Sequence, residues 1–301
     1  MGSILSVCGA KDGVGKTAFA IHLAFGLAKA SQKNVCLIEA DIPNFGDLKT
    51  YLNLKQNKTL VDFIKNSTRL DPKLAQNWIG KNPNGLYVLD AVTFSTDFQN
   101  IDDLGLDKSL KLLARSFDYV IMDLGRDINP LSFRAFENSS LIFVVSSSNV
   151  LAINQTAEFS KKLRSLQFGS DIQKLVLNQY DPRGIISPQV IKQKFNMEAA
   201  VLLPDDPAAF NQSLSQAKPL QMLNPKHPYL KGIDDTIRML STLEEKVEKS
   251  RVTRVGVSQP LDVLKQVLPF SFGGGAGGNQ KILAAGSTSK ALMDRNIAIR
   301  T

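Results

Sequence analysis

Residues 10–17, with the sequence AKDGVGKT, constrain the fold of this chain more than any other stretch. They lie between an apolar, β-branched run at residues 4–8 and an apolar run at 18–28 that has the length of a helix. A strand that turns through glycines into a helix points successive backbone N–H groups at one place, where they can bind an anion. The spacing fits G-x-x-x-x-G-K-[ST], except that Ala10 replaces the first glycine. Such short patterns also arise by chance, but the flanking strand and helix favour a phosphate-binding loop.

Several positions of this loop have a definable chemical role. Gly13 and Gly15 can adopt positive φ and let the backbone approach a ligand. Lys16 would reach the β- and γ-phosphates of a nucleotide, and the Thr17 hydroxyl would bind Mg²⁺. We therefore predict a site for ATP and Mg²⁺ with the loop residues Lys11, Asp12, Gly13, Val14, Gly15, Lys16, Thr17 and Ala18.

The string K-D-G-V-G-K-T resembles the deviant phosphate loop of the MinD/ParA ATPases, K-G-G-x-G-K-[ST]. The resemblance implies that Lys11 crosses to the nucleotide of a second subunit in an ATP-sandwiched homodimer. Apart from the resemblance, Lys11 has the character of a solvated surface lysine. Asp12 departs from the family, because a glycine is usual there. Its carboxylate would repel the phosphates unless it turns outward or meets a cation, so we expect ATP binding more firmly than fast turnover.

Strand-like and helix-like runs alternate along the first 249 residues, which is typical of a mostly parallel, doubly wound α/β sheet. Together with this alternation, the resemblance implies a P-loop NTPase of the SIMIBI, MinD/ParA-like type with a C-terminal appendage. The expected strands are residues 4–8, 34–39, 85–92, a run ending at 123, 140–148, 173–178 and 199–203. The expected helices include residues 15–31, 106–115, 154–166, 208–216 and 229–249.

Acidic residues follow two of these strands at their carboxyl ends, where ligands of such sheets collect. Asp41 stands two residues beyond the strand 34–39, and the resemblance implies that it orients the attacking water. A helix cap or loop acid is the alternative for Asp41, and Glu39 is the weaker candidate because it still lies within the strand. The hydrophobic strand that closes on Asp123 is a second nucleotide-binding signature, and Asp123 can hold Mg²⁺, usually through a water in this fold.

Two further candidate site residues, Gly125 and Arg126, follow the strand that ends at Asp123. The backbone of Gly125 is placed where it could contact the γ-phosphate and so respond to its presence. Arg126 is either a phosphate or interface contact or the partner of Asp127 in a surface ion pair.

The resemblance also implies residues that contact the base. Asn178 ends the strand 173–178, and in the family an asparagine there hydrogen-bonds the adenine edge; a turn-forming asparagine is the alternative. Pro204 and Asp205 follow the last predicted core strand, and the corresponding loop packs beside the base in relatives.

From residue 45 the sequence resembles one branch of the family, the TadZ/CpaE-like pilus-assembly proteins. The branch phrase D-x-x-x-x-F-G-D-[LV]-x-x-Y-L is matched here by Asp41, Phe45, Gly46, Asp47, Leu48, Tyr51 and Leu52. The whole resemblance extends over about residues 1–245. It implies an ATP-bound homodimer that recruits pilus or secretion machinery to one place in a bacterial cell.

Composition limits the remaining functions. With 43% hydrophobic and 21% charged residues, the chain resembles ordinary soluble proteins, and no apolar run approaches the roughly 18 residues of a membrane span. The first strand begins within a few residues of the start, which favours a chain without a signal peptide and predicts a cytoplasmic protein. The resemblance to proteins that place pilus machinery also allows a polar position, or one peripheral to the inner membrane. Cys8 and Cys36 are expected to be buried free thiols, and His22 and His227 to be structural.

The chain beyond residue 249 differs in character. Residues 250–301 carry seven of the Lys and Arg residues against two Asp, which accounts for most of the net charge of +8. We predict an ATPase domain at 1–249, a short amphipathic extension at 250–272, and a Gly-rich linker with a basic tail at 273–301. The extension would dock to a partner or to the body, because membrane binding through so short a stretch is weak.

Two alternative functions remain open. A ParA-type DNA partition ATPase would use the basic tail and bind DNA without sequence preference. A nucleotide-bound scaffold that hydrolyses nothing would explain Ala10 and Asp12.

Overall fold

The computed structural model describes residues 1–31, 33–41, 47–54, 58–83, 85–91, 103–196 and 199–252, with the backbone alone for 246–252. The chain divides into two units, Met1–Lys249 and Ser250–Thr301. The extension expected at 250–272 falls outside the described residues, apart from the backbone of residues 250–252. The tail at 273–301 and the start of the branch phrase at 42–46 also lie outside them.

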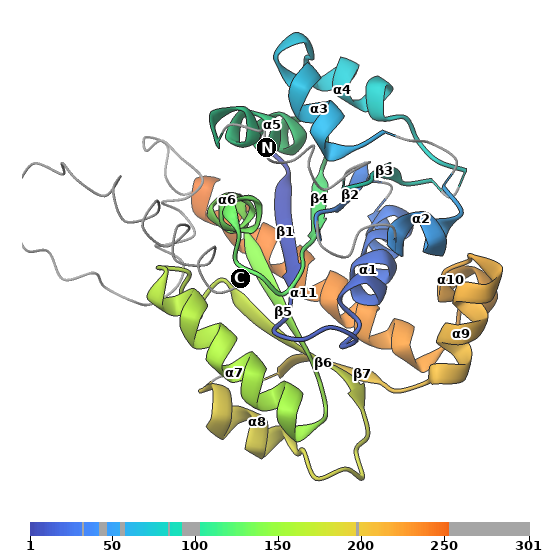
Figure 1. Ribbon diagram of the computed structural model, residues 1–301, viewed down its shortest axis with the longest axis vertical. Coiled ribbons are helices and arrows are strands. Elements are labelled where there is room, and N and C mark those ends of the chain that lie inside the picture. Colours follow the sequence, from blue (N-terminus) through green and yellow to red (C-terminus); the bar gives the residue numbers. More distant parts are fainter. Residues whose placement is uncertain are drawn as a thin grey trace, which may run out of the picture. The chain divides into compact units, whose positions relative to one another are not determined.

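The first unit alternates strands and helices (Figure 1). The strands are β1 (Ser3–Cys8), β2 (Val35–Glu39), β3 (Tyr87–Leu89), β4 (Tyr119–Asp123), β5 (Leu141–Ser147), β6 (Gln173–Tyr180) and β7 (Ala199–Pro204). The helices are α1 (Lys16–Ser31), α2 (Asp47–Leu52), α3 (Leu60–Asn66), α4 (Pro72–Ile79), α5 (Asp103–Ser116), α6 (Pro130–Asn138), α7 (Val150–Ser165), α8 (Pro188–Phe195), α9 (Pro207–Gln216), α10 (Leu220–Leu223) and α11 (Pro228–Val252), with a short 3-10 helix η2 (Ser67–Arg69).

The strands form one sheet in the order β3-β2-β4-β1-β5-β6-β7, and every pair of neighbours is parallel. The predicted α/β fold with a parallel sheet is therefore confirmed. The connection from the carboxyl end of β1 runs through α1 to β2 on one side of β1, whereas the connection from β4 runs through α6 to β5 on the other side. The strand order thus reverses at β1, the place where open α/β sheets bind ligands, and the loop at residues 10–17 follows β1 directly.

Alternate residues of each strand bury themselves on opposite faces of the sheet. Leu5 and Val7 of β1 join a core with α1, α2, α9, α10 and α11, whereas Ile4 and Cys8 join a second core with α3 to α7. Both cysteines are buried and unbridged, as predicted, and burial raises the pKa of each thiol. Helices therefore cover both faces, and the strand ends remain available for a site.

Helix α7 begins four residues earlier than the sequence pattern indicated. The Asn149 side chain accepts a hydrogen bond from the Ala152 N–H at 2.8 Å, which satisfies the first turn and fixes the start. The apolar period used for the prediction misses this turn, because Val150 and Leu151 are exposed.

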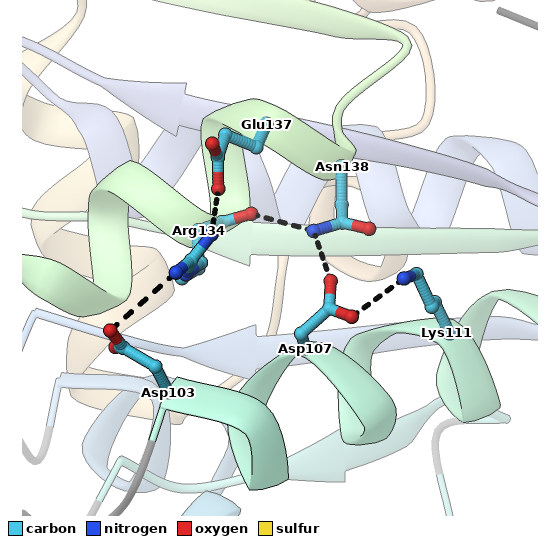
Figure 2. A network of polar contacts seen from close by, with 6 residues as sticks. All are labelled: Asp103, Asp107, Lys111, Arg134, Glu137 and Asn138. Carbon is cyan, nitrogen blue, oxygen red and sulfur yellow. Dashed lines mark hydrogen bonds and ion pairs between the residues drawn. The ribbon is translucent and has the colours of Figure 1, made fainter. Parts of the chain in front are cut away.

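Helix α6 starts just after the exit of β4 and is tied to α5 by polar contacts (Figure 2). The Arg134 guanidinium lies 3.5 Å from an Asp103 carboxylate oxygen and 2.6 Å from one of Glu137. The Asn138 amide donates to Asp107 at 3.3 Å, and Lys111 donates to the other oxygen of that carboxylate at 2.6 Å. Arg134–Asp103 and Asn138–Asp107 join the two helices, whereas the contacts of Glu137 and Lys111 lie within one helix, and each such exposed pair contributes little to stability alone.

Candidate nucleotide-binding site

The loop between β1 and α1 has the backbone that its glycines predict. Gly13 and Gly15 have φ of 75° and 88°, a region that other residues rarely adopt. A Cβ on Gly15 would lie 2.1 Å from the Asn178 amide nitrogen, whereas one on Gly13 would meet nothing within 4 Å. Gly15 is therefore required both by its conformation and by the close approach of β6.

Lys16 is held inside this loop. Its side chain is only 8% exposed, and its ammonium lies 3.4 Å from the carbonyl oxygen of Lys11 and 3.4 Å from Oδ1 of Asp12. The other carboxylate oxygen of Asp12 lies 3.4 Å from the Arg126 guanidinium. Asp12 thus pairs with two cations. A carboxylate at this position was expected either to turn outward or to meet a cation, and the structure shows the second arrangement. Arg126 also lies 4.0 Å from Asp127, so the expected surface pair is present but long.

The end of β6 supports the loop from the other side. The Asn178 side chain is buried, and its amide donates to the Val14 carbonyl oxygen at 2.8 Å. Gln179, with φ of 53°, donates weakly to the Gly13 carbonyl oxygen at 3.4 Å. The sequence pattern placed Asn178 at this edge but missed its contact with the loop, and it missed Gln179 altogether. The adenine contact of Asn178 stays a prediction.

Asp123 ends β4 in a position that suits a metal. Its side chain is 1% exposed, it is hydrogen-bonded to Thr17, and its Oδ1 has no hydrogen-bond partner. Burial raises the pKa of the Asp123 carboxyl to about 7, opposed by the Thr17 hydroxyl and Lys16 and reinforced by Glu39 and Asp41. A buried carboxylate oxygen without a donor beside a hydroxyl is an oxygen set that fits Mg²⁺.

Within the described residues, no group of three or more His, Cys, Asp or Glu side chains is arranged to hold a metal ion. Protein side chains alone therefore do not complete a coordination shell here. Mg²⁺ keeps several waters and shares its shell with substrate phosphates, so Thr17 and Asp123 are a sufficient protein contribution.

Asp41 packs against the exit of β4. A Cβ on Gly125 would lie 2.5 Å from Oδ1 of Asp41, so the glycine is what lets this carboxylate approach the backbone. Glu39 is buried one strand away and accepts a hydrogen bond from the Leu48 N–H of α2 at 3.1 Å. The structure thus places Asp41 beside the end of β4, the strand that carries Asp123, and Glu39 holds the start of α2 through its hydrogen bond with Leu48.

The region after β7 is organised by hydrogen bonds. Pro204 ends the strand beside Tyr180, and Asp205 is exposed. Asp206, the next residue of the same loop, accepts a hydrogen bond from the Ala209 N–H at 3.0 Å, which caps α9, and lies 3.0 Å from His227. These donors lower the pKa of the Asp206 carboxyl. The loop that carries Pro204 and Asp205 is therefore anchored by the adjacent cap, and the base contact itself stays a prediction.

Lys11 lies at the mouth of the loop and is partly exposed. In the part of the chain that the structure describes, its ammonium has no acidic partner. Val14 is buried beneath the loop, and Ala18 follows Thr17 in the first turn of α1. The arrangement leaves the Lys11 side chain available to a ligand or a second subunit.

The fold and this site define a phosphate-binding protein of the P-loop class. The model of the AAA domain family AAA_31 matches residues 2–174, more than half of the chain, so the chain belongs to this family. It is 27% identical over 212 residues to the septum site-determining protein MinD of Thermotoga maritima, covering 68% of this chain and 76% of the relative. It is 22% identical over 209 residues to the chromosome partitioning protein ParA of Myxococcus xanthus, covering 64% and 70%.

Solved structures agree on the fold. A ParA family ATPase from Chlorobium tepidum superposes with a TM-score of 0.72 at 22% identity, covering 78% of this chain and 98% of that one. MinD from Pyrococcus horikoshii, solved with Mg-ADP, gives a TM-score of 0.66 at 17% identity, covering 81% and 98%. The predicted MinD/ParA-like family relationship is therefore confirmed at the level of the family. None of the helices in the described ranges has both the length and the apolar character that crossing a membrane requires.

Proposed function

We propose that this protein binds Mg·ATP at the loop of residues 10–17 and hydrolyses it slowly. The observation that supports this most strongly is the buried Asp123 carboxylate, whose Oδ1 has no partner beside Thr17 and near Lys16. A buried, ionisable oxygen without a donor destabilises a protein unless a cation completes it. The relationship to MinD and ParA ATPases supports the same assignment.

Each residue has a proposed role in the reaction. The backbone N–H groups of residues 13–17 and the Lys16 ammonium bind the β- and γ-phosphates. Thr17 and Asp123 hold Mg²⁺, which supplies positive charge to the phosphate oxygens. Asp41 orients a water beside Gly125, where the backbone is open to the γ-phosphate. Positioning and electrostatics, rather than covalent chemistry, lower the barrier.

We further propose that two copies close over the nucleotides and that Lys11 of each reaches the site of the other. The partly exposed setting of Lys11 and the absence of an acidic partner for it within the described residues support this. Asn178, Pro204 and Asp205 would face the adenine. Sedimentation with ADP and with a non-hydrolysable ATP analogue tests the dimer. A monomer under both conditions would refute the sandwich.

For the cell, we propose that the ATP-bound dimer positions pilus or secretion machinery. Part of the matching phrase, Asp47–Leu52, forms helix α2 next to the buried Glu39 at the site. A fluorescent fusion in the source bacterium should form foci with a pilus component, and Lys16→Ala should disperse them. A fusion that instead covers the nucleoid, with salt-dependent DNA binding in ATP, would support the partition alternative.

Phosphate release by wild type, Lys16→Ala and Asp41→Ala tests the enzymatic step. Lys16→Ala removes a group that stabilises the transition-state charge, which typically costs about 100-fold in rate, and Asp41→Ala removes the group that orients the water, so both variants should fall well below wild type. Lys111→Ala, which removes an exposed lysine of α5, is the matched control and should leave the rate unchanged. Equal background rates in all of these proteins, with ATP still bound, would establish the non-hydrolysing scaffold. The contact between Asp12 and Lys16 is the observation that favours this second candidate.

A further inference from the structure

The Asp12 carboxylate is the one charged group of the loop with a cation on each oxygen among the described residues. Lys16 approaches Oδ1 and Arg126 approaches Oδ2, both at 3.4 Å. The three groups differ in setting, since the Lys16 side chain is 8% exposed and those of Asp12 and Arg126 are 51% and 56% exposed. The contact links the loop after β1 to the exit of β4, beside Gly125 and Asp41.

A cation that neutralises Asp12 affects whether the Lys16 ammonium is free to bind a phosphate. A carboxylate next to the loop competes with a terminal phosphate for the Lys16 ammonium and also repels that phosphate. Two like charges about 6 Å apart in a partly solvated site interact strongly enough to change a binding constant about tenfold. A second cation on the carboxylate reduces both effects. Asp127 offers Arg126 only a longer contact, at 4.0 Å, so it competes weakly.

We propose that Arg126 is a positioning residue that holds the Asp12 carboxylate and thereby releases Lys16 for the terminal phosphate of ATP. The inference rests on the nucleotide binding proposed above and adds a specificity element to it. When a triphosphate arrives, the Lys16 ammonium exchanges Asp12 for the phosphate, and Asp12 remains paired with Arg126. ADP places no phosphate at that point, so the exchange matters more for ATP than for ADP.

The competing explanation is that Arg126 binds the phosphate itself. The two explanations differ in whether the effect of Arg126 depends on the charge of Asp12. If Arg126 acts through Asp12, its removal matters only while residue 12 is ionised. If it contacts the phosphate, its removal costs the same affinity in either background. A double-mutant cycle separates them.

The test measures the affinities of fluorescent ADP and of a fluorescent non-hydrolysable ATP analogue, with Mg²⁺, for wild type, Arg126→Gln, Asp12→Asn and the double variant. Arg126→Gln should weaken the ATP analogue about tenfold, and ADP less, in low salt, and the loss should shrink as salt rises. Asp12→Asn should bind the ATP analogue at least as well as wild type, and the double variant should equal Asp12→Asn. Arg126→Lys, which keeps the charge, should restore most of the affinity.

Arg238→Gln is the matched control, because Arg238 forms an exposed pair with Asp235 on α11 and should not affect nucleotide binding. An equal loss on removing Arg126 in both backgrounds, or no loss in either, would overturn the inference. These results are distinct from failure of the proposed function, in which wild type itself binds neither nucleotide. Unchanged melting temperatures verify that each variant is folded.

Discussion

The carboxyl-terminal edge of the sheet has two halves that differ in their buried polar groups. On the half formed by β2 and β4, Glu39 and Asp41 lie close enough to Asp123 to raise the pKa of its carboxyl, and Asp123 is buried with an unpartnered oxygen. On the half formed by β6 and β7, hydrogen bonds satisfy the polar side chains. Asn178 holds the Val14 carbonyl oxygen there, and Asp206 is paired with His227.

Other buried side-chain atoms without a hydrogen-bond partner differ from Asp123 in charge. The Gln221 amide oxygen and the Tyr229 hydroxyl, on residues that contact His22 of α1, belong to neutral groups, whereas the Asp123 carboxyl can ionise. A neutral group without a partner is a modest defect, but an ionised one demands a cation. The acidic half, formed by β2 and β4, therefore holds an ionisable oxygen that a bound cation would complete, whereas hydrogen bonds satisfy the half formed by β6 and β7.

Among the variants proposed here, Asp123→Asn should have the largest effect on stability, because it removes the buried ionisable group that distinguishes the acidic half. Because the folded-state pKa of Asp123 is raised to about 7, the folded protein binds an extra proton between about pH 4 and 7, and stability falls as pH rises through that range. Removing the charge should stabilise the nucleotide-free protein above pH 7 by up to about 4 kcal/mol. The same change should greatly weaken Mg²⁺-dependent nucleotide binding.

Urea unfolding of the two proteins at pH 5 and pH 8 measures the effect on stability, and titration with Mg²⁺ and nucleotide measures the effect on binding. Asp127→Asn, four residues along at an exposed position, is the control and should change neither. A variant that is no more stable than wild type at pH 8 would mean that the Asp123 charge is already compensated within the protein.

His22→Gln tests a buried, neutral, hydrogen-bonded cluster, formed by α1 with α9, α10 and α11, as the counterpart of the buried Asp123 carboxyl. The His22 ring is fully buried between Phe210 and Tyr229, accepts from the Leu220 N–H at 3.1 Å and contacts the Ala18 carbonyl oxygen at 2.6 Å. Burial lowers its pKa to about 4, so the folded state binds fewer protons than the unfolded state between pH 4 and 6.5.

Stability of the wild type should therefore fall as pH decreases from 6.5 to 4, by up to about 3 kcal/mol from this residue. The Gln variant should start lower, because its hydrogen bonds are poorer, but should lose less over that interval. Chemical denaturation across the range gives the two profiles. The carboxylates contribute equally to both, so parallel profiles would show that His22 does not resist protonation.

The parts of the site that follow local sequence order could be predicted. The loop, Asp41 and Asp123 all lie directly after strands, and strand ends of a parallel sheet meet at one edge whatever the strand order. The alternation of apolar runs was sufficient to predict that edge. Gly125 also followed from its position, although its contact with Asp41 did not.

Contacts between distant parts of the chain could not be predicted. Asn178 and Val14 are 164 positions apart, and their contact depends on β6 lying two strands from β1. The pairs Asp12–Arg126 and Asp206–His227 depend in the same way on how loops from separate strands converge. A single sequence carries no signal for strand order, so these partners appear only in the structure.

The smallest expected effect comes from Asn178→Ala, which also decides what Asn178 does. The change leaves the buried Val14 carbonyl oxygen without its donor, which should cost about 1–3 kcal/mol of stability and loosen the loop. If support of the loop is its whole role, the affinities for ATP and for inorganic tripolyphosphate should fall by the same factor. If it also contacts adenine, ATP should lose more than tripolyphosphate. Asn138→Ala, which removes a part-buried amide between α5 and α6, is the control and should change stability but neither affinity.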